Sequence, residues 1–244
     1  MSRAWDPRLY DALVAARVEP PWEVDVYLAL SRLARGPVLE LGAGTGRILM
    51  TLLSHGVDAY GLELDPEMAR EGQRRLRAAG CGDASERLRV GDMTEFVDPR
   101  RYRLVFIPYN TLALVDSPEG LRSALRCVHR ALDPEGELAF DLFLPDPLRS
   151  NDVGERTLDV SGRAVRYREE SRYDPESRIH ILEQRFFGDG IDQTLVVRMY
   201  HWPRKTLERH LEEAGFSFIV PPLDERGAPV SDHSRVYIAR LRRK

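Results

Sequence analysis

Between residues 37 and 145 the chain alternates short apolar runs with longer amphipathic segments. The apolar runs have the length of β-strands and span residues 37–41, 58–64, 87–93, 102–109 and 136–145. Helical patterns, in which apolar residues recur every three or four positions, span residues 46–56, 65–80 and 117–132. Strands that alternate with helices predict a parallel sheet with helices packed on both of its faces.

After residue 147 the pattern changes to a period of two. Apolar and polar residues alternate over 162–173, 178–187 and 192–202, and residues typical of turns separate the three segments. This alternation predicts a three-stranded antiparallel meander. The pattern then indicates a helix over 203–216 and two last strands over 217–223 and 234–241. We interpret the meander as an insertion that covers one end of the sheet, and not as a separate domain.

Composition and charge narrow the classes of function. The chain has 244 residues, a formal net charge of −3 and a pI near 6.1, so it has no overall attraction to nucleic-acid phosphates or anionic membranes. Its two cysteines, Cys81 and Cys127, have no C-x-x-C partner, which argues against a disulfide framework and a cysteine zinc site. No apolar run reaches about 18 residues, and the N-terminus lacks a signal-peptide core. We therefore expect a cytoplasmic protein without a metal ion.

A glycine-rich turn follows the first apolar run, in the stretch GPVLELGAGTGRIL. Gly42, Gly44 and Gly46 permit positive φ angles and leave no Cβ between the backbone and a ligand. Ligands of open parallel sheets bind at the carboxyl ends of the strands, which is where this turn lies. The dinucleotide fingerprint G-x-G-x-x-G is disfavoured because Arg47 stands in place of its third glycine. Glu40 disfavours it further, since a carboxylate repels a pyrophosphate and attracts an ammonium group.

Two more carboxylates follow at the ends of the next two predicted strands. Glu63 ends the second strand, about twenty residues after the turn, where a carboxylate can accept both ribose hydroxyls of an adenosine. Asp92 ends the third strand and can accept a hydrogen bond from an adenine amine. Together with Glu40 they indicate a site for an adenosine that carries a positively charged, amine-bearing tail. S-adenosylmethionine has this chemistry.

The segments VLELGAGTGRI, GLELD, VGDM, YRLVFIPYNTL and ALDPEGEL resemble successive motifs of class I S-adenosylmethionine-dependent methyltransferases. The resemblance covers roughly residues 37–145 and implies a doubly wound, mostly parallel seven-stranded sheet of Rossmann-like α/β type, with its last strand antiparallel. On this basis residues 1–244 form one methyltransferase domain with the three-stranded insertion. Its expected parts are N-terminal lid or cap helices in 1–30, a cofactor-binding half in 37–147, an acceptor-site insertion in 155–200, and a closing helix with two strands in 203–244.

The resemblance also implies which residues bind the donor. Glu40 and the glycine turn would hold the methionine portion, Glu63 the ribose, and Asp92 with Met93 the adenine. Tyr10, on a predicted N-terminal helix, is a candidate to close over the donor, although packing of that helix is the alternative. The full expected set of cofactor-binding residues is Tyr10, Glu40, Gly42, Ala43, Gly44, Gly46, Glu63, Leu64, Asp92, Met93 and Pro108.

Candidate acceptor residues follow the fourth and fifth strands and end the meander. His201, in MYHWP, and Asp141, at the end of the fifth strand, are the candidate catalytic residues, with packing beside Trp202 as the alternative role of His201. The segment IPYN resembles the Asn-Pro-Pro-Tyr motif of DNA amino-methyltransferases, but Ile107 occupies the asparagine position, which favours a pocket wall. The expected substrate-binding residues are Tyr109, Asn110, Tyr200 and Trp202.

The sequence therefore predicts an enzyme that moves a methyl group from S-adenosylmethionine to a nitrogen or oxygen of a small molecule, leaving S-adenosylhomocysteine. Because no strong base is evident, nitrogen is slightly favoured. The insertion loosely resembles those of amino-sugar and glycopeptide N-methyltransferases. The alternatives are a donor-binding protein of the same fold with another reaction, a nicotinamide-dependent oxidoreductase, and a non-catalytic binding module. We expect no nucleic-acid or membrane partner, and a monomer or homodimer.

Overall fold

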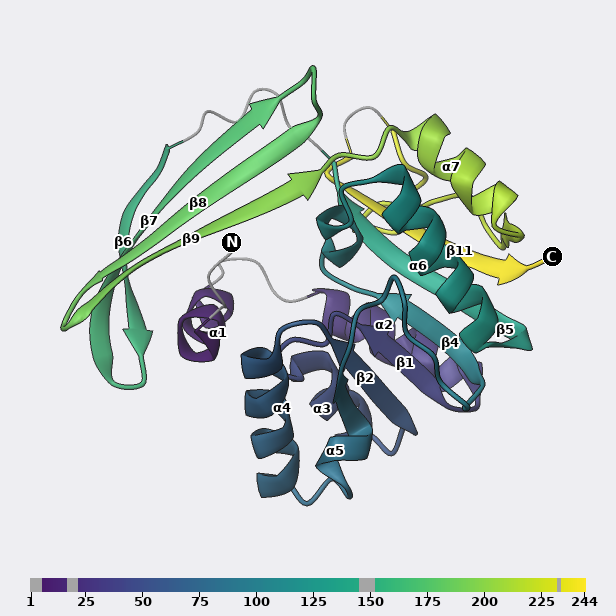
Figure 1. Ribbon diagram of the computed structural model, residues 1–244, viewed down its shortest axis with the longest axis horizontal. Coiled ribbons are helices and arrows are strands. Elements are labelled where there is room, and N and C mark those ends of the chain that lie inside the picture. The colour runs from purple at the N-terminus through teal and green to yellow at the C-terminus, as the bar shows by residue number, and fades with distance from the viewer. Residues whose placement is uncertain (1–5, 17–21, 145–151, 232–233) are drawn as a thin grey trace. The chain divides into compact units, whose positions relative to one another are not determined.

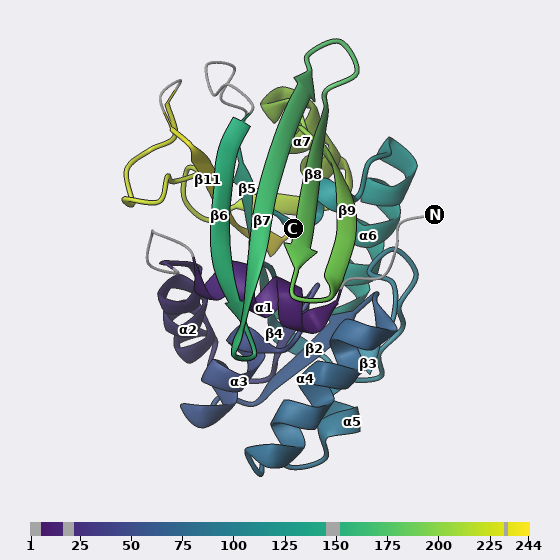
Figure 2. The same ribbon diagram turned by 90° about the vertical axis from the view of Figure 1, so that its left-hand side faces the viewer.

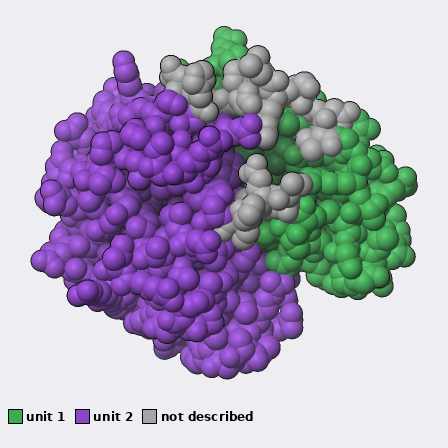
Figure 3. Space-filling model, turned by 180° about the vertical axis from the view of Figure 1, so that it is seen from behind, with its two compact units in different colours: residues 1–20, 145–201 green, residues 21–144, 202–244 purple. Residues whose placement is uncertain are grey.

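The computed structural model describes residues 6–16, 22–144, 152–231 and 234–244. The chain divides into two compact units, which Figure 3 shows in different colours. Unit 1 comprises residues 1–20 and 145–201, and unit 2 comprises residues 21–144 and 202–244. The first of the expected N-terminal cap helices thus belongs to the same unit as the predicted insertion. Parts of the predicted segments 1–30 and 37–147 lie outside the described residues.

Unit 2 contains a seven-stranded sheet in the order β10-β11-β5-β4-β1-β2-β3. Its strands are β1 (Val38–Leu41), β2 (Ala59–Glu63), β3 (Leu88–Val90), β4 (Tyr102–Ile107), β5 (Leu132–Phe143), β10 (Phe216–Phe218) and β11 (Val236–Arg243). Strands β1 to β5 pair in parallel, whereas β11 pairs antiparallel with both β5 and β10. The predicted doubly wound, mostly parallel seven-stranded sheet is confirmed.

Helices cover both faces of this sheet (Figure 1). They are α2 (Trp22–Ala34), α3 (Arg47–Ser54), α4 (Pro66–Ala78), α5 (Ala84–Arg87), the 3₁₀ turn η1 (Thr111–Leu114), α6 (Pro118–Ala131) and α7 (Arg204–Glu213). One buried cluster joins α2, α3 and α4 to the sheet through Tyr27, Ile48 and Leu76. Helices α6 and α7 pack against each other. The helices predicted at 46–56, 65–80, 117–132 and 203–216 are therefore confirmed.

Strand order reverses at β1, which lies between β2 and β4. This place in the sheet is its topological switch point, and the turns after β1 and β4 are the switch-point turns. The chain leaves β1 toward β2 and β3 on one side, and it later leaves β4 toward β5 on the other side. The turns after β1 and β4 therefore diverge at the carboxyl edge of the sheet, and a crevice opens between such turns in doubly wound folds. The residues predicted to bind ligands lie in both of these turns, at the edge of the sheet where such folds bind their ligands.

Unit 1 contains a four-stranded antiparallel sheet, where the sequence predicted three strands (Figure 2). Its strands are β6 (Asp152–Val160), β7 (Arg163–Asp174), β8 (Ile179–Gly188) and β9 (Ile191–Tyr200), paired in chain order. The prediction missed β6. Its alternation is interrupted where the pairing register shifts between Asp152 and Glu155, so no clean period of two appears in the sequence.

Helix α1 (Pro7–Ala15) packs on the antiparallel sheet within unit 1. Leu9 of this helix is fully buried in a cluster with Leu158 of β6, Val165 of β7 and Phe186 of β8. One half of this face of the sheet is therefore apolar and covered. Within the described ranges, no helix combines the length and the apolar character needed to cross a membrane.

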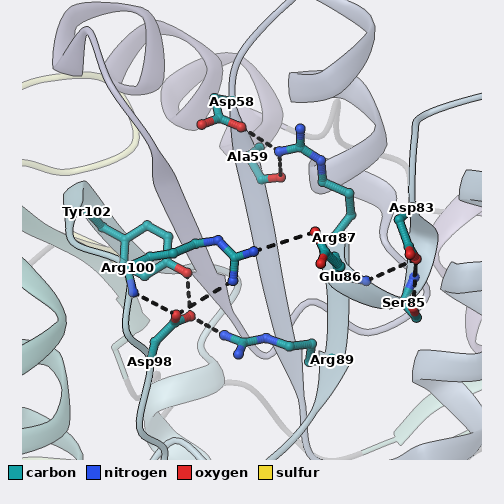
Figure 4. A network of polar contacts seen from close by, with 10 residues as sticks. All are labelled: Asp58, Ala59, Asp83, Ser85, Glu86, Arg87, Arg89, Asp98, Arg100 and Tyr102. Carbon is teal, nitrogen blue, oxygen red and sulfur yellow. Dashed lines mark hydrogen bonds and ion pairs between the residues drawn. The ribbon is translucent and has the colours of Figure 1, made fainter.

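A buried carboxylate organises the amino end of β4 (Figure 4). Asp98 accepts hydrogen bonds from the hydroxyl of Tyr102, at 2.5 Å, and from the backbone N–H of Arg100, at 3.0 Å, and it forms an ion pair with Arg89. Burial raises the pKa of this carboxyl, but the hydroxyl, the N–H group and the guanidinium outweigh burial and hold its pKa below the usual value. This network joins β3 to β4 at the edge opposite the switch-point turns.

We expect Asp98→Asn to lower the free energy of unfolding by about 1–3 kcal/mol, because Arg89 and Tyr102 lose a charged acceptor. Since the folded-state pKa of Asp98 is lowered, its contribution is present above the unfolded-state pKa of about 3.9 and fades as the pH falls through the lower folded value. Urea denaturation followed by circular dichroism, at neutral pH and near pH 3, measures both effects. Tyr102→Phe is the matched control and should cost less. Equal stability of Asp98→Asn and wild type at neutral pH would contradict the role of this network.

Candidate functional site

The glycine turn after β1 is held in a left-handed conformation. Gly42, Gly44 and Gly46 have φ angles of +77°, +57° and +79°, a region that residues with a Cβ rarely adopt. The backbone N–H groups of Gly42 and Ala43 donate to the carbonyl of Leu62, at 2.8 and 3.1 Å, which ties the turn to the end of β2. Gly46 then begins α3, whose first N–H groups lie at this edge of the sheet.

A close approach joins this turn to the one after β4. A Cβ added to Gly42 would lie 2.3 Å from the Cγ2 atom of Thr111, closer than any real contact of this kind. Thr111 is itself held in place, because its hydroxyl donates to the carbonyl of Pro108 at 2.6 Å. Only glycine fits at position 42, so the two turns of the switch point pack directly on each other.

Glu63 holds the glycine turn from the end of β2. Its Oε2 atom accepts the N–H of Gly44 at 2.7 Å, and its Oε1 atom accepts the N–H of Asp65 at 2.8 Å. Burial raises the pKa of this carboxyl despite both bonds. A carboxylate oxygen can accept more than one hydrogen bond, so Glu63 keeps acceptor capacity for ribose hydroxyls. Leu64 beside it is 65% exposed, an unusual position for a large apolar side chain.

Glu40, in β1, is a buried carboxylate with an unused oxygen. Only 2% of the residue is exposed, and its Oε2 atom accepts no hydrogen bond from the described residues. Burial raises its pKa to about 8, and the charge of Arg47 opposes this increase only in part. A buried carboxylate with an unpaired oxygen is costly, and a cationic ligand group would reduce that cost. This orphaned oxygen and the glycine cradle fit the ammonium-bearing end of S-adenosylmethionine.

Arg47 has a structural partner that the sequence analysis did not identify. Its Nη2 atom lies 2.8 Å from the Oε1 atom of Glu23, which is fully buried on α2. The arginine that disfavours the dinucleotide fingerprint thus anchors α2 to the start of α3. Nothing in the sequence pattern distinguishes Glu23 from a surface residue of an amphipathic helix, since its burial depends on tertiary packing.

Asp92 follows β3 at the same edge of the sheet. The segment lies beside Glu63, because the N–H of Gly91 donates to the Glu63 carbonyl at 2.9 Å. The Oδ1 atom of Asp92 accepts from the backbone N–H and the hydroxyl of Thr94, at 2.7 and 2.8 Å. Asp92 therefore caps its own turn, and Met93 within the turn is half-buried. Recognition of adenine by Asp92 and Met93 stays a prediction.

Asp141 fixes the turn after β4. The residue is fully buried, and its two oxygens accept hydrogen bonds from the N–H groups of Tyr109 and Asn110, at 2.8 and 3.0 Å. Both of these residues have positive φ angles, +55° and +60°, which the bonds help to maintain. The hydroxyl of Tyr27, on α2, donates to Asp141 at 2.8 Å. Burial raises the pKa of Asp141 to about 6, although these three donors lower it. The geometry gives Asp141 a positioning role, and a direct part in catalysis stays a prediction.

The remaining predicted residues are divided between the two units. Tyr10 lies on α1, and Tyr200 and His201 lie at the end of β9, all in unit 1. The backbone N–H of His201 donates to the carbonyl of Arg178 at 2.9 Å. Trp202 belongs to unit 2, where its ring meets that of His210 edge to face at 6.1 Å. The structure thus brings the donor candidates of unit 2 together, and it places His201 directly after the last strand of the antiparallel sheet.

Comparison with known proteins identifies the larger fold. Residues 38–136 match a family described as a methyltransferase domain. This segment of the chain is similar to a methyltransferase domain. This match covers β1 to the start of β5, the part of the chain that holds Glu40, the glycine turn, Glu63 and Asp92. The match agrees with the predicted resemblance to methyltransferases over this segment.

Solved structures show that the likeness extends over the whole chain. An S-adenosylmethionine-dependent methyltransferase from Clostridium acetobutylicum has a TM-score of 0.77 at 16% identity, covering 96% of each chain. A sugar N-methyltransferase from Streptoalloteichus has a TM-score of 0.78 at 21% identity, covering 100% of this chain and 94% of that one. An amino pentose methyltransferase from Micromonospora echinaspora, bound to S-adenosylmethionine, has a TM-score of 0.74 at 21% identity, covering 97% of each chain. At these identities the likeness shows the fold.

A curated relative matches part of the chain at a higher sequence identity than these solved structures. The ribosomal RNA small subunit methyltransferase A of Synechococcus is 32% identical over 107 residues. The match covers 43% of this chain and spans about a third, 34%, of that relative. The match is therefore limited to one shared segment, and it does not show that the two proteins have the same methyl acceptor.

We expect Gly42→Ala to weaken S-adenosylmethionine binding at least tenfold, because the new methyl group would displace Thr111 and deform both turns. Gly56→Ala is the matched control, since Gly56 has a similar φ of +74° and nothing within 4 Å of an added Cβ. Both variants carry the backbone strain of about 1–2 kcal/mol, but only the first carries the clash. Calorimetric titration with the donor measures the difference. Thr111→Ser, which removes the clashing methyl group, should restore part of the affinity of Gly42→Ala. Equal affinities of the two glycine variants would place the donor elsewhere.

Proposed function

We propose that this protein transfers the methyl group of S-adenosylmethionine to an amine nitrogen of a small molecule, leaving S-adenosylhomocysteine. The observation that carries the proposal is the buried Glu40 carboxylate beside the left-handed glycine turn. A buried acid with one unpaired oxygen suits a cationic ligand, and a turn without side chains suits a ligand that lies against the backbone. The bound donor supplies an electrophilic methyl group and a sulfur leaving group.

Each donor-binding residue has a distinct part in the proposal. Glu40 attracts the ammonium group, and the N–H groups at the start of α3 are available to the carboxylate of the same ligand. Glu63 accepts the ribose hydroxyls, and Asp92 with Met93 borders the adenine. Ala43, Leu64, Pro108 and Tyr10 remain the further proposed donor contacts.

The proposal also specifies which chemical group accepts the methyl group. Fold neighbours named as a sugar N-methyltransferase and an amino pentose methyltransferase support a small amine, such as an amino sugar. An amine needs only to arrive without its extra proton, whereas a hydroxyl needs a base within hydrogen-bond reach. Asp141 already accepts three hydrogen bonds, so it is a poor candidate for the base that a hydroxyl acceptor would need. This supports a nitrogen acceptor over an oxygen acceptor, and it leaves His201 as the better candidate base.

The antiparallel sheet is the proposed acceptor side of the enzyme. Every donor candidate except Tyr10 lies in unit 2, so the donor site does not account for the four strands of unit 1. Tyr109, Asn110, Tyr200 and Trp202 remain the proposed substrate contacts. In-line placement of the acceptor nitrogen against the methyl carbon is worth about 7–11 kcal/mol of the activation barrier, so this side has a catalytic task even without a strong base.

An RNA acceptor is the second candidate, because the curated relative is a ribosomal RNA methyltransferase. The net charge of −3 disfavours it, since RNA binding requires positive charge along the phosphate backbone. A donor-binding protein with another reaction would share all the donor contacts, so only a transfer assay distinguishes it.

The test uses methyl-labelled S-adenosylmethionine with nucleotide-linked amino sugars, free hexosamines, short peptides and ribosomal RNA as separate acceptors. We expect label to move to an amine and S-adenosylhomocysteine to form in equal amount. Label on RNA would overturn the proposed acceptor class. Donor binding without transfer to any acceptor would favour the non-methylating alternative.

We predict that the affinity for S-adenosylmethionine rises about tenfold between about pH 5.5 and about pH 7. The free Glu40 carboxyl, with a pKa of about 8, is mostly protonated in this range. A cationic ligand group favours the carboxylate, lowers its pKa in the complex and so releases a proton on binding. The range lies below the α-amino pKa of about 7.7, so an α-amino group keeps most of its charge throughout it.

Calorimetry at several pH values measures this dependence, and buffers of different ionisation enthalpy report the released proton. Glu40→Gln should remove most of the pH dependence and lower the affinity, because a neutral amide replaces the titrating group. Glu67→Gln, at an exposed position on α4, should leave both unchanged. The same pH dependence in Glu40→Gln would show that another group titrates.

A further inference from the structure

Helix α1 packs on one face of the antiparallel sheet in unit 1, which we call the α1 face, and the residues that it covers there are apolar. The same face continues along the strands beyond Tyr167 and Phe186, because side chains two positions apart in a strand lie on one face. Register places Glu169 and Gln184 next on this face, directly opposite each other on β7 and β8. The α1 face thus changes from apolar to polar within one step along the strands.

A network of three side chains occupies this border. The hydroxyl of Tyr167 donates to the Oε2 atom of Glu169. The Nε2 atom of Gln184 donates both to that hydroxyl and to the same carboxylate oxygen, at 2.8 Å each. Burial and the hydrogen bond to Glu169 raise the pKa of Tyr167, so its hydroxyl keeps its proton. These bonds also fix the Gln184 amide, because the opposite orientation would place its oxygen against the carboxylate.

The network leaves the amide oxygen of Gln184 unused. Gln184 is 3% exposed, and its Oε1 atom accepts no hydrogen bond from the described residues. A buried acceptor without a hydrogen bond costs free energy that a donor would recover. Stability alone would favour an apolar residue here, since Phe186 and Leu195 occupy the neighbouring positions on this face. The unused oxygen therefore points to a ligand that donates a hydrogen bond.

Arg156 adds an unused donor at the same border. It lies opposite Tyr167 on β6, and its guanidinium carbon is 5.1 Å from the centre of the Tyr167 ring. Its Nε atom is buried and donates no hydrogen bond to the described residues. The border thus presents an amide oxygen that can accept, a guanidinium nitrogen that can donate, and the carboxylate of Glu169.

Beyond this border the α1 face is only half-buried. Glu169 on β7 is half-buried, and so are Leu182 and Val197, which lie opposite each other on β8 and β9. Sites for small molecules combine apolar side chains with a few placed polar groups. This part of the face has both kinds of group.

The unused atoms match a hydroxyl group better than a charged group. A hydroxyl donates one hydrogen and also accepts at its oxygen, so it can donate to Gln184 and accept from Arg156. An ammonium group has no acceptor for Arg156, and a carboxylate has no donor for Gln184. Two neighbouring hydroxyls can serve the amide oxygen, the guanidinium and the carboxylate together.

We propose that Gln184, Glu169 and Arg156 form a binding site for neighbouring hydroxyl groups of a sugar-like ring. The inference rests on the proposed function for the identity of this ligand, since an amino sugar carries such hydroxyls beside its amine. All three residues belong to unit 1, so that unit alone supplies the site. They select the ligand, and they take no part in moving the methyl group.

The test measures sugar binding to the full chain without S-adenosylmethionine. Calorimetry with glucosamine, galactosamine and mannosamine gives the affinities, and the ¹⁵N side-chain amide signal of Gln184 reports the contact. We expect Gln184→Met and Glu169→Gln to weaken the best of these ligands about tenfold or more. Glu170→Gln is the matched control and should bind like wild type, because Glu170 is the next residue of β7, lies on the opposite face and forms an ion pair with Arg168.

Monodeoxy analogues of the same sugar show whether a hydroxyl is the bound group. At least one analogue should bind the wild type about tenfold more weakly than the parent sugar. The same analogue and its parent should bind Gln184→Met equally, because the partner of the hydroxyl is already gone. Equal losses in both proteins for every analogue would contradict the assignment of Gln184 to a hydroxyl.

Urea denaturation separates a ligand site from a purely structural network. Methionine is close to glutamine in length and has no amide, so Gln184→Met removes the unused oxygen together with the two donated bonds. We expect its urea midpoint to equal or exceed that of the wild type. A lower midpoint with unchanged sugar affinity would show a structural network and overturn the proposal. Absence of binding of all three hexosamines to the wild type would overturn it as well.

The labelled-donor assay keeps this inference apart from the proposed function. We expect Gln184→Met to raise the KM for an amino-sugar acceptor about tenfold with kcat within about twofold, since hydroxyl contacts form equally in the bound ligand and in the transition state. An unchanged KM would refute the site and leave methyl transfer in place. Hexosamine binding without methyl transfer would refute the proposed function and leave the site in place.

Discussion

The hydrogen bonds that Asp141 accepts are the interaction on which the geometry of the switch point depends. This single buried carboxylate at the end of β5 binds the N–H groups of Tyr109 and Asn110 and the hydroxyl of Tyr27. It thereby connects β5, the turn after β4 and α2. A turn with two consecutive left-handed residues that are not glycine is strained, and it persists only where surrounding contacts determine it. The position of Thr111, and through it the fit against Gly42, follows from this turn.

Charge burial around β1 links this framework to ligand binding. Glu23, Glu40 and Asp141 are all buried in unit 2, and Arg47 is the cation paired with the first of them. An isolated domain would gain stability by exchanging such acids for apolar residues, since removing charge from water is costly. Glu40 has no hydrogen bond to its Oε2 atom among the described residues, so the structure retains an unfavourable group at the position proposed for the cationic donor. Local rules of stability are commonly broken in this way at functional sites.

The two units differ in the kind of group that they offer. Unit 2 presents buried carboxylates, glycines and backbone N–H groups, which suit a cationic nucleoside. Unit 1 presents hydroxyl and imidazole side chains on neighbouring chain segments.

The amino-acid sequence by itself determined the alternation of strands and helices in unit 2 and the residues at its strand ends. These features are local: the apolar period, the caps such as Asp65, and the glycines that a left-handed turn requires all lie within a few residues of one another. They predicted Glu40, Gly42, Glu63 and Asp92 at one edge of the sheet.

Only the tertiary structure decided which side chains are partners across long sequence separations. The bond between Tyr27 and Asp141 spans 114 positions, the ion pair between Glu23 and Arg47 spans 24, and the pair of His180 and His201 depends on strand register. Strand β6 was missed for the same reason, since its interrupted alternation becomes a strand only through pairing with β7. Burial and hydrogen-bond partners are properties of packed elements, and a local pattern of residue types does not contain them.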